Sequence, residues 1–320
     1  MISATDKILI TGGAGLIGSH ISDSLLRQYN PEIIVLDNFS RGRRENLRTS
    51  LMCGHVDIVE GDVRDVDVVH EVVKGVDIIF HLAGMKITQC AEDPRLAVEV
   101  LVNGTFNVLE AAALSGVRKV VIASSSESYD AAEPWPTRPY TENLSGATKL
   151  FMEDLLRNFH RMYGTDYVAL RYSSVYGPRM RPNGICEILA RWIERLAQRQ
   201  ACVIAGDGQD SIDLVFVEDI ARAAIMAGAS NVTNEVLNIA GSTENTLAEV
   251  ALTLGRVMGS DLPLQYTCAK QDQPYSRRLP DTDRVAQLLG FRPQVPLEDG
   301  LRHLVAWWER HRSIGQLEMV

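Results

Sequence analysis

The feature that most constrains the fold is a glycine-rich turn near the start of the chain. Thr11-Gly12-Gly13-Ala14-Gly15-Leu16-Ile17-Gly18 separates an apolar run, Lys7–Ile10, from an amphipathic segment, Leu16–Tyr29. Glycines in such a turn let a strand lead directly into a helix, and they let a pyrophosphate approach the amides at the helix N-terminus. With a strand before it and a helix after it, the turn predicts a dinucleotide site. Its expected contacts are Gly12, Gly15, Leu16, Ile17 and Gly18.

An acidic residue follows the second apolar run at the spacing that such a site requires. Asp37 comes directly after Ile33–Leu36 and lies 19 residues beyond Gly18. A carboxylate there accepts hydrogen bonds from ribose hydroxyls and repels a 2′-phosphate, which favours NAD over NADP. Arg41, Arg43 and Arg44 keep NADP open as an alternative, and a structural glycine turn beside a surface aspartate is the other interpretation. We predict NAD.

Apolar runs and helical segments continue to alternate through the first half of the chain. Further strands are expected at Val56–Glu60, Asp77–His81 and Lys119–Ala123, with a long helix from about Arg95 to Ser115. Parallel strands need crossover connections, and strands buried on both faces are continuously apolar. The predicted fold class is therefore α/β, a Rossmann doubly wound parallel sheet.

The alternation loosens after about Arg171. Segments rich in Pro and Gly separate shorter elements, and the last clear helix is Leu297–Arg312. We expect an NAD-binding Rossmann domain over residues 1–171 and a smaller C-terminal α+β substrate lobe over 172–320. The boundary is approximate, and segments of the two can interleave.

The composition excludes several classes of protein. A net charge of −9, with the basic residues scattered, argues against a nucleic-acid partner. We find no basic leader or apolar signal core, and no run approaching the roughly 18 apolar residues of a membrane span. The five cysteines lie far apart, which predicts reduced thiols, no metal site and a cytoplasmic protein.

An ordered set of motifs resembles the extended short-chain dehydrogenase/reductases, in particular the NAD-dependent nucleotide-sugar epimerases and dehydratases such as UDP-glucose 4-epimerase. The resemblance runs from about residue 6 to residue 312. Beyond the glycine turn, its members are Asp37-Asn38, Asp62-Val63, His81-Leu82-Ala83-Gly84, Asn103-Gly104-Thr105, Leu170-Arg171-Tyr172, Val175–Arg179 and Gly206–Gly208. Such an ordered set is far more specific than any one of its members.

The resemblance assigns further cofactor contacts. It implies that Asn38, Asp62, Val63, Leu82, Ala83 and Lys86 bind NAD, with Asp62 and Val63 at the adenine. Gly84-Met85-Lys86 is similar to the Gly-Leu-Lys of UDP-galactose 4-epimerases, so Lys86 is also expected to contact the substrate; an ordinary surface lysine is the alternative. His81 is expected to be a packed residue, and Asn103 to hydrogen-bond within the core.

The resemblance also exposes a departure at the reactive position. In the family a Ser or Thr, a Tyr, and a Lys four residues after that Tyr carry the chemistry, because the lysine lowers the phenol pKa from about 10. Here Gly146-Ala147-Thr148-Lys149-Leu150 is intact, but the residue four before Lys149 is Ser145. A serine hydroxyl is shorter and much less acidic than a phenol. Tyr140 is the alternative phenol.

The remaining catalytic candidates follow the fifth strand. Aligned on Tyr129, Ser125 falls at the family's Ser/Thr position, and Ser126 is expected to contact substrate. Glu127 falls where 4,6-dehydratases and UDP-glucuronate decarboxylases carry a glutamate. A buried carboxylate there can act as an acid or base, whereas an exposed loop glutamate would not.

The substrate pocket departs from the family at two positions and matches at a third. Ser174 stands where an Asn usually precedes Val-Tyr-Gly-Pro, and Ile212 where an Arg often precedes Asp213. Arg278 matches the arginine that grips the diphosphate, a task suited to its fork of donors. Arg179 is a further candidate substrate contact, and Arg191 a weaker one.

These residues favour one function and leave alternatives open. The first is an NAD-dependent nucleotide-sugar epimerase, a 4-epimerase of a UDP-hexose or UDP-hexuronate that acts through transient C4 oxidation. The alternatives are an NDP-sugar dehydratase or UDP-glucuronate decarboxylase using Glu127, or a catalytically impaired NAD and nucleotide-sugar binder; an unrelated substrate also stays open. By analogy with the family, we expect a homodimer that pairs the helix bearing Lys149 with the long helix before the fifth strand.

Overall fold

The computed structural model describes residues 1–126, 143–181, 184–268 and 280–313. They form two compact units. The first unit comprises Met1–Tyr172, Ile220–Ile239 and Thr282–Phe291, and the second comprises Ser173–Asp219, Ala240–Asp281 and Arg292–Val320. The division into domains 1–171 and 172–320 stays a prediction.

The first unit is built on a parallel sheet of seven strands in the order β10-β6-β5-β4-β1-β2-β3. These strands are β1 (Lys7–Thr11), β2 (Glu32–Asp37), β3 (Val56–Glu60), β4 (Ile78–His81), β5 (Lys119–Ser125), β6 (Tyr167–Tyr172) and β10 (Glu235–Ile239). Successive strands run outward in opposite directions from the β1–β4 pair, which is the switch point of a doubly wound sheet. The predicted Rossmann fold class is confirmed.

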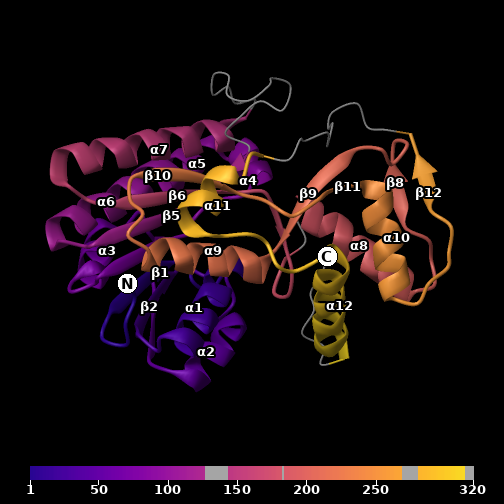
Figure 1. Ribbon diagram of the computed structural model, residues 1–320, viewed down its shortest axis with the longest axis horizontal. Helices are drawn as coiled ribbons and strands as arrows, with labels where there is room; N and C mark the ends of the chain where they lie inside the picture. Colours follow the sequence, from indigo (N-terminus) through magenta and orange to yellow (C-terminus); the bar gives the residue numbers. More distant parts are fainter. Residues whose placement is uncertain (127–142, 182–183, 269–279, 314–320) are drawn as a thin grey trace. The chain divides into compact units, whose positions relative to one another are not determined.

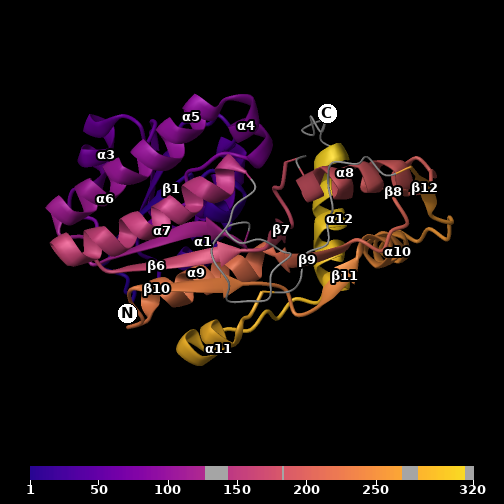
Figure 2. The same ribbon diagram turned by 90° about the horizontal axis from the view of Figure 1, so that it is seen from above.

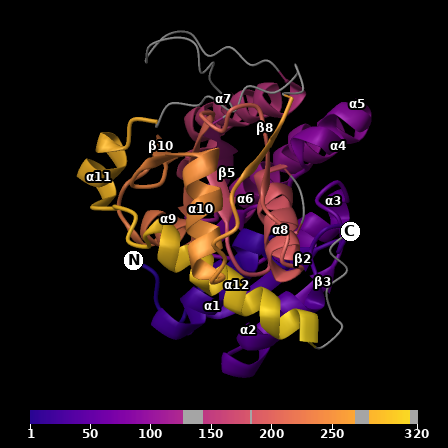
Figure 3. The same cartoon turned by 90° about the vertical axis from the view of Figure 1, so that its right-hand side faces the viewer.

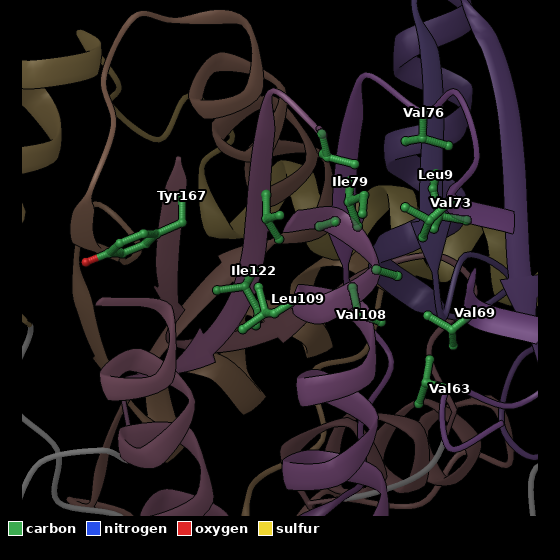
Figure 4. Close-up of a cluster of buried hydrophobic side chains, with 14 of the residues drawn as sticks. Leu9, Val63, Val69, Val73, Val76, Ile79, Val108, Leu109, Ile122 and Tyr167 are labelled. Atoms are coloured by element: carbon green, nitrogen blue, oxygen red, sulfur yellow. The ribbon is translucent and has the colours of Figure 1, made fainter. Parts of the chain in front are cut away.

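Helices cover both faces of this sheet (Figures 1 and 2). α3 (Val66–Val73), α6 (Gly104–Ser115) and α7 (Leu144–Tyr163) pack on one face, and α1 (Leu16–Gln28) and α9 (Val217–Ala229) cover the other. Figure 4 shows the core beneath the first group, where valines and leucines of α3 and α6 meet Leu9, Ile79 and Ile122 of the strands. Alternate strand residues enter this core because successive side chains point to opposite faces.

The predicted long helix is a continuous stretch with an irregular centre. It consists of α5 (Pro94–Val98), a single π-helical segment η2 (Glu99–Asn103), and α6. By length and composition it could cross a membrane, so the expectation that no stretch approaches such a span was wrong for this helix. Half of its most apolar window is buried in the structure.

Four shorter helical elements complete the first unit. They are η1 (Arg44–Leu47), α2 (Arg48–Cys53), α4 (Ile87–Glu92) and α11 (Asp283–Leu289), and the last of these packs on β10.

The second unit contains a three-stranded sheet, a two-stranded sheet and helices that pack beside them (Figure 3). β9 (Ser211–Phe216) pairs in parallel with β7 (Ser174–Tyr176) and antiparallel with β11 (Glu244–Thr246). β8 (Val203–Ala205) pairs with β12 (Gln265–Thr267). The helices are α8 (Gly184–Ala197), α10 (Leu247–Val257) and α12 (Leu297–Ser313).

Candidate active site

The glycine turn lies where the ends of β1 and β4 meet. Gly12 has φ +66°, and a Cβ there would stand 2.8 Å from the Ala83 nitrogen and 2.9 Å from the Leu82 carbonyl carbon. A Cβ at Gly18 would stand 2.6 Å from Gly13 Cα. Both positions therefore require glycine. Gly12 lies against the backbone that follows β4, and Gly18 lets α1 pack closely against the turn.

The N-terminus of α1 fits a pyrophosphate. Its N-cap is Gly15, which has no side chain that could cap the first-turn amides. Among the described residues, a Cβ at Gly15 would meet the Gly12 carbonyl oxygen, at 3.1 Å, and no side chain. Leu16 and Ile17 are half-buried and provide first-turn amides. Uncapped amides at a helix N-terminus favour an anion.

Asp37 ends β2 as a buried carboxylate. It accepts hydrogen bonds from the amides of Ala14 at 2.9 Å and Phe39 at 2.8 Å. Burial raises the pKa of Asp37, and these two hydrogen bonds and the charge of Arg41 lower it in part. A carboxylate offers about four lone pairs, so Asp37 can still accept hydrogen bonds from ribose hydroxyls. Arg44, which kept NADP open, pairs with Glu60 at 2.7 Å.

Asp62 is already surrounded by donors. Arg64 donates to it from its amide at 2.9 Å and from its guanidinium at 3.0 and 2.9 Å, and Asn38 donates at 2.8 Å. Burial opposes ionisation, but the hydrogen bonds from Arg64 and Asn38 and the charge of Arg64 prevail and lower the pKa of Asp62 to about 2. These four donors use all of its lone pairs. An adenine amine would have to displace one of them.

The loop that carries Asp62 is held in place by contacts with α6. Val63 is buried, and a Cβ at Gly104 would stand 2.6 Å from its side chain. Asn107 donates to the Val63 carbonyl at 3.0 Å. Asn103, which was expected to hydrogen-bond within the core, is exposed, and the buried asparagine of this helix is Asn107.

The reactive candidates lie at the carboxyl end of β5. Lys149 of α7 donates from Nζ to the Ala123 carbonyl at 2.7 Å, which holds its ammonium near the carboxyl end of β5, whose last residue is Ser125. Ser145 lies one turn before Lys149 and is buried. α7 begins at Leu144 because Asn143 caps it, accepting from the Gly146 amide at 2.8 Å. Ser145 and Lys149 thus share one face of one helix.

A buried ion pair beneath this end of the site was not predicted. Glu153 lies one turn beyond Lys149, accepts from Ser124 Oγ at 2.6 Å, and pairs with Arg171 of β6 through two hydrogen bonds. Both charged side chains are more than nine-tenths buried. The spacing from Lys149 to Glu153 on a predicted helix was the available signal. Through Ser124 and Arg171, Glu153 fixes α7 to β5 and β6.

Other predicted residues of the first unit line the exit of β4 and the end of β5. Leu82, Ala83, Lys86 and Ser126 are all partly buried. Lys86 is the N-cap residue of α4, and its amide donates to Gln89 Oε1 at 3.3 Å. Glu127, Tyr129, Tyr140 and Arg278 lie outside the described residues.

The predicted substrate residues of the second unit surround β7 and β9. Ser174 begins β7, and Ile212 is buried in β9. Arg179 has φ +70°, a left-handed conformation that costs a non-glycine residue on the order of 1 kcal/mol and that clusters at functional sites. Arg191 is exposed and pairs with Glu187 at 3.7 Å.

One group of potential metal ligands, Glu32, His55 and Asp57, lies at the amino ends of β2 and β3. This is the opposite end of the strands from the glycine turn, and Glu32 pairs there with Lys7 at 3.1 Å.

Comparison with known proteins identifies the family. Residues 8–240 match the NAD dependent epimerase/dehydratase family. The chain belongs to this family. The predicted family, cofactor and enzyme class are therefore confirmed, and the glycine turn, α1 and Asp37 are suited to NAD.

Individual relatives extend over nearly the whole chain. A UDP-glucose 4-epimerase of Mycolicibacterium smegmatis is 31% identical over 316 residues, covering 96% of this chain and 99% of the relative. A UDP-N-acetyl-alpha-D-glucosaminuronate decarboxylase of Bacillus cytotoxicus is 30% identical over 319 residues, covering 94% and 97%. The crystal structure of a UDP-glucose 4-epimerase from Thermotoga maritima with UDP-glucose has a TM-score of 0.86 at 29% identity, covering 96% and 99%.

Proposed function

We propose that this protein is an NAD-dependent 4-epimerase of a UDP-hexose or UDP-hexuronate. The observation that carries the proposal is Lys149, whose Nζ is held at 2.7 Å from the Ala123 carbonyl at the end of the strand that also carries Ser125. A cation fixed there can bind a ribose hydroxyl, and a serine hydroxyl beside it can hydrogen-bond a sugar hydroxyl. The similarity to UDP-glucose 4-epimerases over nearly the full length of the chain supports this choice.

Each residue has a defined task in this proposal. When bound, NAD would supply a reversible acceptor for the C4 hydride. Lys149 would hold the cofactor ribose, Ser125 would hold the C4 hydroxyl, and the α1 N-terminus with Asp37 would bind the remainder of the dinucleotide. The C4 hydroxyl proton has to leave as the hydride leaves, and it returns when the hydride is added to the other face of the sugar.

Ser145 limits the rate of that proton transfer. An alcohol is far less acidic than a phenol, whose pKa is about 10, so Ser145 can pass a proton through a hydrogen bond but is a poor base. We propose that it relays the proton to a water. General-base catalysis contributes about 10²–10⁴-fold, so turnover should be slow while ligand binding is retained.

An assay of the purified protein with NAD and a panel of UDP-, GDP- and dTDP-sugars tests the proposal. Sugar NMR should show slow formation of the C4 epimer of one UDP-sugar. A 4-keto-6-deoxy product would identify a dehydratase, and loss of carbon dioxide a decarboxylase; the Bacillus cytotoxicus relative makes the latter the second candidate. Ligand-induced stabilisation with no product would identify a binder and contradict the epimerase.

We also propose a cytoplasmic homodimer without a membrane or nucleic-acid partner. α6 and α7 pack side by side and expose large apolar side chains, namely Phe106, Leu114, Phe151, Met162 and Tyr163. An exposed apolar patch of this kind is typical of a protein interface. Light scattering should give a dimer mass, and Phe151→Glu should shift it to the monomer. A wild-type monomer at micromolar concentration would contradict this proposal.

A further inference from the structure

A chain of buried hydrogen bonds passes through His81. Thr11 Oγ1 lies 2.7 Å from His81 Nδ1, His81 Nε2 lies 3.0 Å from Thr105 Oγ1, and Thr105 Oγ1 donates to the Leu101 carbonyl at 2.7 Å. The three side chains are at most 1% exposed. The chain therefore joins the ends of β1 and β4 to the start of α6 without access to solvent.

The direction of each hydrogen bond in this chain follows from its last member. Thr105 has one hydroxyl proton, and it donates that proton to Leu101, so His81 Nε2 must be the donor to Thr105. Burial first, and the charge of Lys149 second, lower the pKa of His81 to about 3, so its ring is neutral and carries one N–H. Nδ1 is then an acceptor, and Thr11 donates to it.

The direction of these hydrogen bonds determines what Thr11 can accept at the other end of the series. Because Thr11 Oγ1 gives its proton to His81, its lone pairs are available to the amides of Leu82 at 3.2 Å and Ala83 at 3.3 Å. Ala83 is the residue whose nitrogen a Cβ at Gly12 would approach to 2.8 Å. These hydrogen bonds thus hold Leu82 and Ala83, the residues that follow β4, against the glycine turn. The turn lies at the switch point of the sheet, where such sheets bind their ligands.

The Leu101 end of this series of hydrogen bonds has a second unusual feature. Leu101 belongs to the π-helical segment Glu99–Asn103, and single π turns are frequent at functional sites. Thr105 is the second residue of α6, directly beyond this segment. The hydrogen bond from Thr105 to Leu101 spans the junction between the π turn and the regular helix.

We propose that Thr11, His81 and Thr105 form a positioning relay for the cofactor site, in which His81 is fixed as the neutral tautomer protonated on Nε2. His81 is a positioning residue in this relay: it orients Thr11, and Thr11 orients the Leu82 and Ala83 amides. The relay concerns the NAD site alone and does not depend on which sugar the enzyme converts.

The test combines one spectrum with matched threonine variants. Proton–nitrogen correlation spectra of isotope-labelled wild-type protein at pH 7 should show His81 with its proton on Nε2. Thr11→Ser keeps the hydroxyl and should bind NAD within about twofold of wild type, whereas Thr11→Val removes it and should bind about tenfold more weakly. Thr253→Val is the control, because Thr253 is a buried threonine of α10 whose hydroxyl donates to Glu249. Its NAD affinity should not change.

Two results would overturn the relay. One is a His81 ring with its proton on Nδ1, a measurement that needs no variant. The other is equal NAD affinity for the Thr11→Val and Thr11→Ser proteins, even if the valine variant melts at a lower temperature, since that loss would show a structural role alone. Should Thr11→Val fail to fold, Thr105→Val and Thr105→Ser provide the same comparison from the other side of the ring.

Discussion

The cofactor end and the reactive end of the site depend on single residues in opposite ways. At the cofactor end, Gly12 and Gly18 stand where any Cβ would collide with backbone, so the turn depends on the absence of side chains. At the reactive end, Lys149 donates to the Ala123 carbonyl near the end of β5, and we propose that Ser145 takes the position of the family's phenol. The fold thus fixes the geometry of the cofactor end, whereas the chemistry that we propose for the reactive end depends on the single side chain at position 145.

The largest expected effect comes from restoring that side chain. Ser145→Tyr should raise the conversion rate about 10²–10⁴-fold, because Lys149 one turn later would lower the phenol pKa and create a general base. Ser145→Phe is the matched control, since it adds the same ring without the hydroxyl and should give no gain. Steady-state rates on the converted UDP-sugar and NAD affinity by calorimetry are the measurements. Equal rates for the two variants would show that the reactive end lacks more than a phenol.

The next largest effect is expected on stability, from the buried ion pair that anchors α7. Glu153→Gln leaves the buried Arg171 without its counter-charge and should lower the free energy of unfolding by about 3 kcal/mol. Asp154→Asn on the same helix removes an exposed carboxylate, paired with Arg157 at 2.6 Å, and should cost less than about 1 kcal/mol. Urea unfolding of both variants measures the difference. Similar losses would mean that this ion pair does not anchor α7.

A backbone change tests the cofactor end. Gly12→Ala should weaken NAD binding about 10- to 100-fold, because the new Cβ would collide with Ala83 and the residue would keep a left-handed φ. Gly75→Ala is the control: it has φ +70°, but apart from its chain neighbours no atom of the described residues lies within 4 Å of the added Cβ. It should cost about 1 kcal/mol of stability with unchanged NAD affinity. If both variants bind NAD alike, the close approach to Ala83 is not what shapes the site.

These two ends were also unequally predictable from the sequence. The glycine turn, Asp37 and the apolar strands are local signals, and the structure places them within a residue or two of the expected positions. The ion pair of Glu153 with Arg171 joins segments 18 residues apart, and only the folded sheet brings them together. Asn103 was misplaced because the π turn holds an extra residue, which rotates the flanking side chains relative to a regular helix. The spacing from Lys149 to Glu153 places Glu153 on the same helix face, but it does not identify Arg171 as the partner, and no local pattern marks the π turn.

The smallest expected effect is a pH dependence that follows from His81. Its pKa is about 3 in the folded protein and about 6.5 in an unfolded chain, so the unfolded state binds more protons between these values. Stability should therefore fall as the pH is lowered through this window, by about 1.0 kcal/mol from pH 6.5 to pH 5.5 for this one group. Asp62, with a pKa of about 2, adds its own loss only below about pH 4. Urea unfolding at a series of pH values in this range should show that the free energy of unfolding changes less with pH in His81→Gln than in wild type. NMR should show no titration of His81 above pH 4; a ring that titrates near pH 6 would place His81 in contact with water and remove the buried link between the glycine turn and β4.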